Sequence, residues 1–360
     1  MTITKRIHRD RPGKRLPEID CVVIGVNCSA TLGRCLGSIQ DSSYPVELIN
    51  IIYVDGGSQD NSVEVAQSFM GVKTIRLMPE YPTPGLGRNE GWKHGKAPLV
   101  MFLDSDTIMD RDWLTKSVNG LTEEMGAIIG NREEMQPRAS FFNWVASLEW
   151  NGKPGMTDSF GGDVMVRREV LELTSGYDEE LVGGEDPELS QRVRMGGWSI
   201  RHLDCAMTRH DLAMTRFSQY WKRAYRSGYG FAAVVDRHRN NNSQFWHREI
   251  LRIGIRGGGS LSLLLLSLIF LLCSIYTKVF FAIFLISFSL SQLLLFFPRL
   301  FRVKSFVREK NLIIEHAKLY AWHCSIVVVP QFAGIVRYQF GRIFHLPLRN
   351  KRSRLATAAL

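Results

Sequence analysis

The sequence predicts an α/β domain built on a mostly parallel sheet flanked by helices, followed by a C-terminal helical membrane region. Two observations predict this: strand-like apolar runs alternate with helix-like segments from Ile19 onward, and the composition changes sharply after about residue 256. Such alternation is typical of βαβ units around a parallel sheet. The 360 residues suffice for one large domain and a smaller region, because domains commonly run to about 100–200 residues. We therefore expect a basic tail over residues 1–18, an α/β domain over 19–245 and a membrane-associated region over 246–360.

Four short apolar runs are the expected strands, and they span residues 21–26, 49–54, 72–77 and 99–103. The segment between the second and third runs, residues 60–69, has apolar positions three and four residues apart and begins at a capping residue, Asp60 or Ser62, so it reads as a helix. In open α/β sheets the ligand binds beyond the carboxyl ends of the strands. The first candidates for a site are therefore the polar residues directly after the runs: Asn27, Asp55, Asp104 and Asp106.

Two uncharged runs in the last third are the expected membrane helices, near residues 260–276 and 279–297. Each approaches the roughly 17–25 residues that a membrane-crossing helix needs. Arginines precede the first run, a basic cluster follows the second, and the turn between them carries only Lys278. The positive-inside rule then places both flanks, and the α/β domain, on the cytoplasmic side of the cytoplasmic membrane. A buried hairpin in a soluble domain is the alternative, but soluble cores rarely contain such long unbroken apolar runs.

A third apolar stretch, near residues 319–338, contains His323, Pro330 and Gln331. If this stretch crossed the bilayer, the basic tail at 349–354 would end outside, against the same rule. We therefore expect the segment to lie at the membrane interface.

The net charge of +10 and the pI near 9.4 suit nucleic acid, an anionic membrane or a phosphorylated substrate. Basic residues alternate with apolar runs in the last third, which is the pattern of membrane topology, so no nucleic-acid partner is predicted. The N-terminus lacks the apolar segment of a signal peptide, so nothing directs the first two-thirds out of the cytoplasm. The six cysteines show no paired CxxC spacing and are expected to be reduced and mostly buried.

The triplet Asp104-Ser105-Asp106 directly follows an expected strand. Two carboxylates at a strand end can share one hard divalent cation, which in turn binds the oxygens of a diphosphate. Such triplets also cap helices and fill turns, so the position after the strand is what favours a metal site.

Two further segments supply candidates for nucleotide binding. Asp55 begins a Gly-rich turn after the second strand, where a carboxylate can accept hydrogen bonds from a nucleobase or ribose; an ordinary βα turn is the alternative. Arg88 lies in Gly85–Gly91 and has the fork-shaped cation that suits phosphate. That segment is not the dinucleotide-binding pattern, because it does not lead from a strand into a helix with the right spacing.

An acidic pair, Glu185-Asp186, stands just before an expected helix, with Pro187 at a favoured first position. A carboxylate here could remove the proton from an attacking hydroxyl group. Alternatively, Asp186 simply caps the helix.

Taken together, these motifs resemble the inverting family-two glycosyltransferases of the GT-A fold, in which the sheet is Rossmann-like. The resemblance covers roughly residues 19–229 and depends on the order and spacing of the motifs. The ordered set comprises the strand ending in Asn27, Val-Asp-Gly-Gly-Ser-x-Asp, Arg-Asn-x-Gly, Phe-Leu-Asp-Ser-Asp, Phe160-Gly-Gly162, Gly-Glu-Asp-x-Glu-Leu, and His210 followed by a basic helix. The membrane tail makes the chain similar to bacterial exopolysaccharide-type members.

The resemblance implies a role for each residue on the donor side. Asp55 would bind the base, usually uracil, and Asn27 and Arg88 would lie near the nucleotide. Asp104 would contact the ribose and the metal, and Asp106 would be the surer ligand of the divalent cation, Mg²⁺ or Mn²⁺.

It implies roles on the acceptor side as well. Asp186 would be the catalytic base, and Glu185 beside it would orient it or bind the acceptor. Gly161 and Gly162 would line the acceptor side, and His210 would complete the metal or diphosphate site.

The sequence departs from the family pattern in two places. Gly56 stands where many relatives carry a second acidic residue, which puts nucleotide contacts there in doubt. Processive synthases carry Gln-x-x-Arg-Trp after the acidic pair, whereas here Gln191 and Arg194 are followed by Met-Gly-Gly before Trp198. Transfer of a single sugar is therefore expected.

The expected function is inverting, metal-dependent transfer of one sugar from a nucleotide-diphosphate sugar, UDP-linked by the resemblance, to a hydroxyl acceptor. The membrane hairpin suggests a lipid-linked glycan acceptor in surface polysaccharide synthesis. One alternative is a sugar nucleotidyltransferase, but that needs a phosphate-cradling loop after the first strand, for which residues 26–33 are a poor match. The other is a non-catalytic membrane scaffold that retains the fold.

Overall fold

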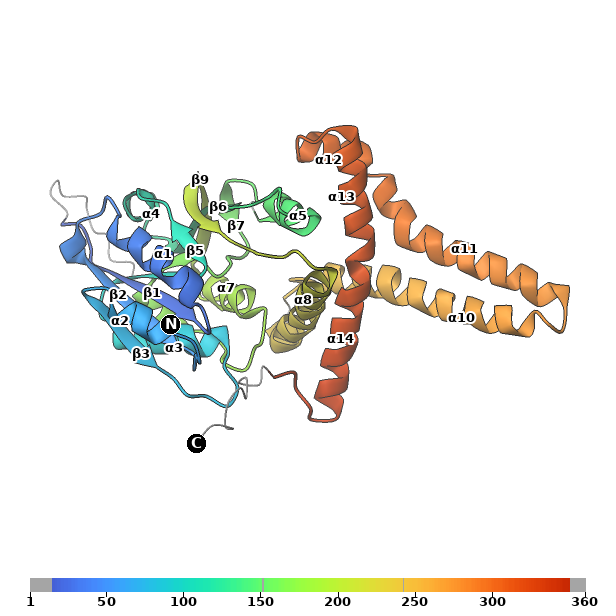
Figure 1. The fold of residues 1–360 in the computed structure, drawn as a ribbon, viewed down its shortest axis with the longest axis horizontal. Coiled ribbons are helices and arrows are strands. Elements are labelled where there is room, and N and C mark those ends of the chain that lie inside the picture. Colours follow the sequence, from blue (N-terminus) through green and yellow to red (C-terminus); the bar gives the residue numbers. More distant parts are fainter. Residues whose placement is uncertain (1–14, 151, 242, 350–360) are drawn as a thin grey trace.

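The computed structural model describes residues 15–150, 152–241 and 243–349. The basic residues before Arg15 and after Arg349, on which the sequence analysis drew, lie outside these ranges. The chain forms an α/β domain, from which a long helical hairpin is separated by further helices (Figure 1).

One mixed sheet of nine strands organises the α/β domain. Its strands are β1 (Ile19–Gly25), β2 (Ile49–Asp55), β3 (Val72–Arg76), β4 (Leu99–Asp104), β5 (Thr107–Met109), β6 (Met125–Glu134), β7 (Gly155–Thr157), β8 (Val164–Arg167) and β9 (Ser199–His210). The order is β3-β2-β1-β4-β8-β6-β9-β5, and β7 pairs with β9. The four expected strands, β1 to β4, are parallel, whereas β4–β8, β6–β8, β5–β9 and β7–β9 are antiparallel pairs.

Helices cover both faces of the sheet, and this explains why β1 and β4 read as continuous apolar runs. Alternate residues of β1 face different cores: Cys21 and Val23 pack in one cluster, and Val22 packs in the other. The first cluster contains side chains of helix α1 (Ser29–Gln40), and the second contains Trp92 of α3 (Pro84–His94) and Leu189 of α7 (Glu185–Met195). Packing on both faces thereby fixes the position of the central strands and of the loops at their ends.

The helices of the α/β domain connect and cover these strands. They are α1 (Ser29–Gln40), α2 (Ser62–Gln67), α3 (Pro84–His94), α4 (Trp113–Gly120), α5 (Phe141–Glu149), α6 (Arg168–Thr174), α7 (Glu185–Met195) and α8 (Phe217–His238). Short 3-10 turns lie at Val46–Leu48 and Arg239–Asn241.

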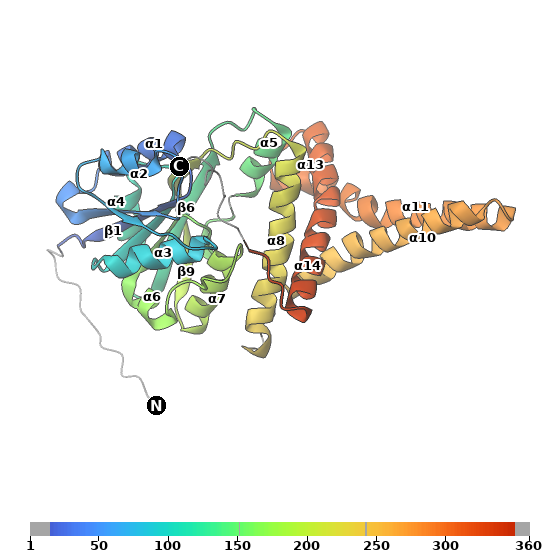
Figure 2. The same cartoon turned by 60° about the horizontal axis from the view of Figure 1, so that its bottom comes forward.

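The described part of the C-terminal region consists of helices joined by short turns. It contains α9 (His247–Ile253), a π-helical turn (Gly254–Gly258), α10 (Gly259–Cys273), α11 (Lys278–Leu300), α12 (Val303–Glu309), α13 (Ile314–Ile326) and α14 (Val328–Ile343). The helices α10 and α11 form a hairpin that points away from the sheet, and α13 and α14 run across its base next to α8 (Figures 1 and 2).

Two glycines bring α8 and α14 into backbone contact. A Cβ atom on Gly228 of α8 would overlap the carbonyl group of Gln331, and one on Gly334 of α14 would overlap that of Tyr225. A hydrophobic cluster around Tyr229 and Ile335 continues this contact along both helices. The helix α8, which we assigned to the α/β domain, is thus packed tightly against the C-terminal region.

Among the residues that the structure describes, three helices are long and apolar enough to cross a membrane: His247–Cys273, Lys278–Glu309 and Ile314–Ile343. In the apolar window of the third helix 44% of the residues are buried inside the protein, compared with 11% in the second. The third helix is therefore much more covered by protein than the hairpin.

Several local expectations change in detail. The helix expected over residues 60–69 is the shorter α2, and its N-cap is Asn61, although Asp60 Oδ1 accepts the N–H of Ser62 at 3.1 Å. All six cysteines are free, but only Cys21 and Cys35 are buried, so the expectation of mostly buried cysteines was wrong for the other four.

Candidate active site

The loops after β1, β2 and β4 lie side by side. Ser105 donates its backbone N–H to the carbonyl of Ile24 at 3.1 Å, and Gly56 donates to Gly25 at 2.9 Å. These bonds follow from the parallel register, in which Ile24 stands opposite Asp104 and Gly25 opposite Asp55. The three loops therefore lie at one edge of the sheet, where ligands bind in open α/β sheets.

Asp55 is turned into its own loop. It is fully buried, and its Oδ2 atom accepts the backbone N–H groups of Gly57 at 3.1 Å and Ser58 at 3.0 Å. Its Oδ1 atom accepts the hydroxyl of Tyr53 at 3.2 Å. Direct contact with a nucleobase stays a prediction; the observed contacts support a role in shaping the Gly-rich turn.

Asn27 ties the first loop to the second. Its Oδ1 atom accepts the N–H of Gln59 at 2.8 Å, and its own N–H is donated to the hydroxyl of Ser58 at 2.8 Å. Its φ of 52° lies in the left-handed region, which Asn tolerates better than most residues.

A cavity of about 440 Å³ opens beside these two loops. Backbone and side chains from the ends of β1 and β2, the segment after β3 and the start of α3 line it, and Arg226 of α8 contributes from the other side. Apolar walls come from Ile24, Val26, Val54, Leu77, Pro82 and Leu86. Its size falls within the range of small-molecule sites, about 300–1,000 Å³.

Arg88 gathers three of the predicted carboxylates. Its NH2 atom donates to Asp104 Oδ1 at 2.8 Å, its NH1 atom donates to Glu185 Oε1 at 2.9 Å, and NH1 lies 3.5 Å from Asp186 Oδ1. The Arg88 side chain is only 2% exposed. We expected this cation to meet phosphate; in the structure it is occupied by carboxylates and holds β4 and α7 together.

Asp186 lies in the first turn of α7 and does not cap it. The N-cap is Gly184, in the left-handed conformation with φ 91°, and Pro187 is the third residue of the helix. The reading of Asp186 as a mere N-cap was therefore wrong. Burial away from water, opposed by Arg88 and reinforced by Glu185 and Asp104, raises the pKa of Asp186 to about 8. A carboxyl group with this pKa is suited to take up a proton near neutral pH.

Asp104 has the opposite environment. Its burial alone would favour the neutral acid, but the charges of Arg88, Arg132 and His210 outweigh this and lower its pKa. The pKa values of Asp104 and Asp186 are thus pushed apart, as in sites where one carboxyl group moves a proton and another stays charged.

Asp104, Asp106 and His210 form a possible metal site. One ligand atom of each lies within 4.8 Å of the others, and His210 Nε2 is 3.2 Å from Asp106 Oδ1. His210 is buried and its Nδ1 atom has no hydrogen-bond partner among the described residues. Burial disfavours the charged ring, but the hydrogen bond to Asp106 outweighs it and raises the pKa of His210. Two carboxylates and an imidazole fit a divalent cation such as Mn²⁺.

The Gly161-Gly162 loop lies against the carboxylates. A Cβ atom on Gly162 would stand 2.5 Å from Asp104 Oδ2 and 2.8 Å from Arg88 NH2, whereas one on Gly161 would meet nothing within 4 Å. Only the second glycine is therefore required for close approach. The next residue, Asp163, accepts the backbone N–H of Asp104 at 3.1 Å.

The residues that enclose the candidate metal ligands were not predicted from the sequence. Arg132 lies 2.8 Å from Asp163 Oδ2, and its guanidinium stands 5.7 Å from the ring centre of Trp150. The Trp150 ring in turn meets the His210 ring edge to face at 5.1 Å. Arg132 follows the apolar run of β6, so the strand-end rule that found Asp104 could have found it.

Two family descriptions match this chain. Residues 20–171 match "Glycosyl transferase family 2", and residues 99–301 match "Glycosyl transferase family group 2". The chain is 22% identical over 226 residues to the glycosyltransferase AglE of Haloferax volcanii, covering 60% of this chain and 73% of that protein. It is 23% identical over 257 residues to the probable glycosyltransferase YdaM of Bacillus subtilis, covering 65% of this chain and 60% of that protein.

The fold also matches a solved structure, the mannosyltransferase PcManGT of Pyrobaculum calidifontis in complex with GDP-Man and Mn²⁺. The TM-score is 0.60 at 14% sequence identity, covering 92% of this chain and 89% of that one. This agreement covers most of both chains and supports the GT-A fold expected from the motifs. The strand-end carboxylates, the mixed sheet and the match over residues 99–301 lead to one conclusion: the chain is a glycosyltransferase and belongs to glycosyl transferase family group 2.

Proposed function

We propose that the chain transfers one sugar from a nucleotide-diphosphate sugar to a hydroxyl group of a lipid-linked acceptor, with inversion, at the cytoplasmic face of a membrane. The observation that carries this proposal is the arrangement around Arg88, which places Asp104 and Asp186 on its two terminal nitrogens. A donor-side carboxylate and a general base are thereby held next to each other, with room for a ligand in the neighbouring cavity.

In this proposal the chain's own groups bind, orient and move one proton. Asp186 accepts the proton of the attacking hydroxyl, and its raised pKa suits that task. Glu185 stays paired with Arg88 and fixes the first turn of α7. Asp104, Asp106 and His210 would hold a divalent cation, which when bound supplies positive charge next to the departing diphosphate.

The cavity beside β1 and β2 is the proposed place of the nucleotide. Its apolar walls suit the faces of a base, and Asn27 offers polar atoms at its edge. The structural relative from Pyrobaculum binds GDP-Man with Mn²⁺, which supports the class of donor and cation but leaves the base and sugar to experiment. The resemblance of the motifs favours a UDP-linked donor.

A donor screen tests this function. Purified full-length protein is incubated with UDP- and GDP-sugars plus Mn²⁺ or Mg²⁺, and release of the nucleoside diphosphate is measured. Asp186→Asn should lower turnover by about 10²- to 10⁴-fold, the usual contribution of a well-placed base, with donor binding retained. The control is Asp112→Asn, an exposed carboxylate at the start of α4, which should change nothing. Undiminished turnover of Asp186→Asn would refute the assignment.

The same screen separates the competing functions. A nucleotidyltransferase would release pyrophosphate from a nucleoside triphosphate, and a scaffold would bind no donor. Chelation of the cation should abolish turnover, and the anomeric configuration of the product, read by NMR, tests inversion.

The membrane arrangement is proposed from the shape of the C-terminal region. The α10–α11 hairpin crosses the bilayer, because it projects freely and exposes large apolar side chains such as Leu272, Ile275 and Leu293. The helices α13 and α14 run across the base of the hairpin and are partly covered by α8, so they lie along the cytoplasmic interface. A protease site inserted at the 276–278 turn should be cut from outside intact cells, and one inserted before α9 should not.

A further inference from the structure

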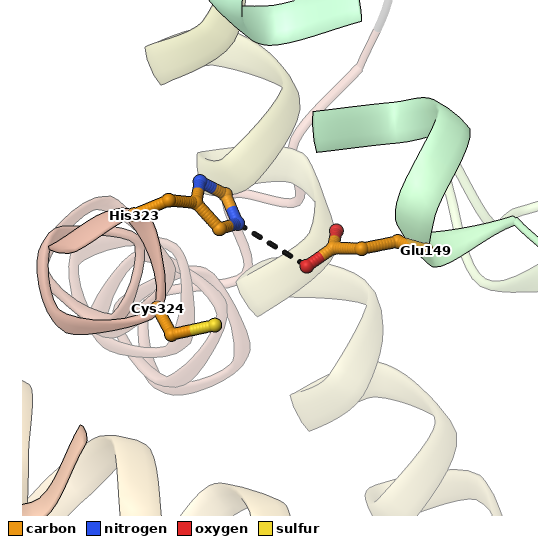
Figure 3. A group of neighbouring side chains, drawn as sticks. All are labelled: Glu149, His323 and Cys324. Atoms are coloured by element: carbon orange, nitrogen blue, oxygen red, sulfur yellow. Dashed lines mark hydrogen bonds and ion pairs between the residues drawn. The ribbon is translucent and has the colours of Figure 1, made fainter. Parts of the chain in front are cut away.

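A second group of metal-binding side chains lies where the α/β domain meets the C-terminal helices. Glu149 ends α5, and His323 and Cys324 stand in the third turn of α13. One ligand atom of each lies within 4.8 Å of the others, and the three side chains point into the same space (Figure 3). Residues almost 175 positions apart in the sequence are thus brought together.

Two tyrosines hold these side chains in place. His323 is 3% exposed; its Nε2 atom is 3.2 Å from Glu149 Oε1, and its Nδ1 atom is 3.0 Å from the hydroxyl of Tyr220. Tyr320 donates its hydroxyl to Glu149 Oε1 at 3.1 Å. Metal-binding histidines and carboxylates are typically oriented by such outer partners, which fix the ring and the tautomer. The group therefore has both the ligands and their supports.

We propose that Glu149, His323 and Cys324 bind one transition-metal ion of the zinc type. A thiolate, an imidazole and a carboxylate are the ligands of Zn²⁺, whereas Mg²⁺ and Mn²⁺ prefer oxygen. This set therefore selects a different ion from the carboxylate-rich group at Asp106.

Binding requires a defined exchange of protons. The Cys324 thiol loses its proton to water and binds as the thiolate, and Glu149 binds as the carboxylate. The His323 ring is neutral: Nε2 offers its lone pair to the ion, and Nδ1 carries the ring hydrogen and donates it to the hydroxyl oxygen of Tyr220. A water molecule completes four-coordination. The observed cluster needs to contract only modestly, since typical bonds are about 2.0–2.3 Å.

The position of this site gives it a consequence for the active site. Trp150 directly follows Glu149 and rests on the His210 ring. An ion bound by Glu149 and α13 would pin the end of α5 to the juxtamembrane helix and so hold Trp150 against His210. The second site thereby offers a way for metal availability to act on the catalytic centre without entering it.

Cobalt(II) binding tests the proposal. Purified full-length protein is titrated with Co²⁺, and near-ultraviolet absorption from thiolate-to-cobalt charge transfer is recorded. The group at Asp104, Asp106 and His210 contains no sulfur and is silent in this measurement. We expect one equivalent of absorbing cobalt, which one equivalent of Zn²⁺ displaces.

Substitutions of single residues show which side chains give rise to the cobalt band. Cys324→Ser should abolish the band and His323→Gln should weaken it at least tenfold in affinity, whereas Cys273→Ser at the end of α10 should leave it unchanged. Glu149 is 44% exposed, so Glu149→Gln should fold normally and provides a second loss-of-binding variant if Cys324→Ser proves unstable. Absence of the band in the wild-type protein, or a band that persists in folded Cys324→Ser, would overturn the proposal; if Cys324→Ser does not fold, an undiminished cobalt affinity of Glu149→Gln would overturn it instead. Neither outcome depends on the proposed donor or acceptor.

Discussion

Replacement of Arg88 by Gln should destabilise the protein far more than loss of an equally well-paired surface arginine. The Arg88 guanidinium is almost fully buried and is the shared partner of Asp104, Glu185 and Asp186. Removing one member of a buried ion-pair group leaves uncompensated buried charge and costs about 3–5 kcal/mol. The matched control is Arg237→Gln: Arg237 also makes two short ion pairs but is 37% exposed, and exposed pairs contribute at most about 1 kcal/mol.

The assay is thermal unfolding of the detergent-solubilised protein, followed by tryptophan fluorescence at several pH values. In Arg88→Gln the neighbouring positive charge is lost, so the pKa of Asp186, which is already raised in the folded state, should rise further above the unfolded value. A raised carboxyl pKa contributes stability at low pH that is lost as the pH rises through the folded-state value. The loss of unfolding temperature in Arg88→Gln, relative to the wild-type protein at the same pH, should therefore grow from pH 5 to pH 8.

A second substitution checks the cause. Glu185→Gln introduced into Arg88→Gln removes one of the unpaired charges and should restore part of the stability. If Arg237→Gln lowers the unfolding temperature as much as Arg88→Gln, or if the double variant is no better than the single one, burial of shared charge is not what makes Arg88 important.

Further predictions follow from the same contacts. The pH profile of kcat/KM should fall on the acid side with an apparent pKa well above that of an ordinary aspartate, because Asp186, the proposed base, must be ionised to accept a proton; a profile that stays flat down to pH 5 contradicts this. Gly162→Ala should lower transfer about tenfold or more, because overpacking typically costs about 1–3 kcal/mol, while Gly161→Ala, with open space around it, should stay near wild type in the same assay. Gly334→Val should separate α14 from α8 and lower the unfolding temperature, whereas Gly254→Ala, which meets nothing within 4 Å, should not.

The first half of the sheet could be predicted mainly because its central strands, β1 and β4, are buried on both faces. The runs expected at β1 and β4 are uninterrupted and apolar, and the strand-end rule then led to Asp104 and Asp106; the run at β2 is apolar apart from Asn50, and the edge strand β3 carries charged residues among its apolar ones. The later strands carry mixed patterns: β9, for example, combines buried, partly exposed and exposed residues in no regular order over its twelve positions. Sequence periodicity alone gave no comparable signal there, and these strands were not assigned.

The roles of single site residues depend on long-range contacts that the sequence does not display. Asp55 and Arg88 have the residue types of ligand-binding groups, yet Asp55 faces its own turn and Arg88 faces carboxylates from two other segments. Trp150 gave no sequence signal, because its contact with His210 crosses 60 positions of the chain and arises only when β9 and α5 are packed.

The backbone crossing at Gly228 and Gly334 also sets a geometric limit on catalysis. At this crossing the two backbones are in direct contact, so α8 cannot tilt towards α14 without overlap, and the sheet and its carboxylates stay at one height above α14. If α14 lies on the lipid surface, the carboxylates are held at a fixed distance from that surface. Acceptors whose hydroxyl lies much closer to the bilayer, or much farther from it, would stay out of reach of Asp186, and selection would act on the length of the anchor as well as on the sugar.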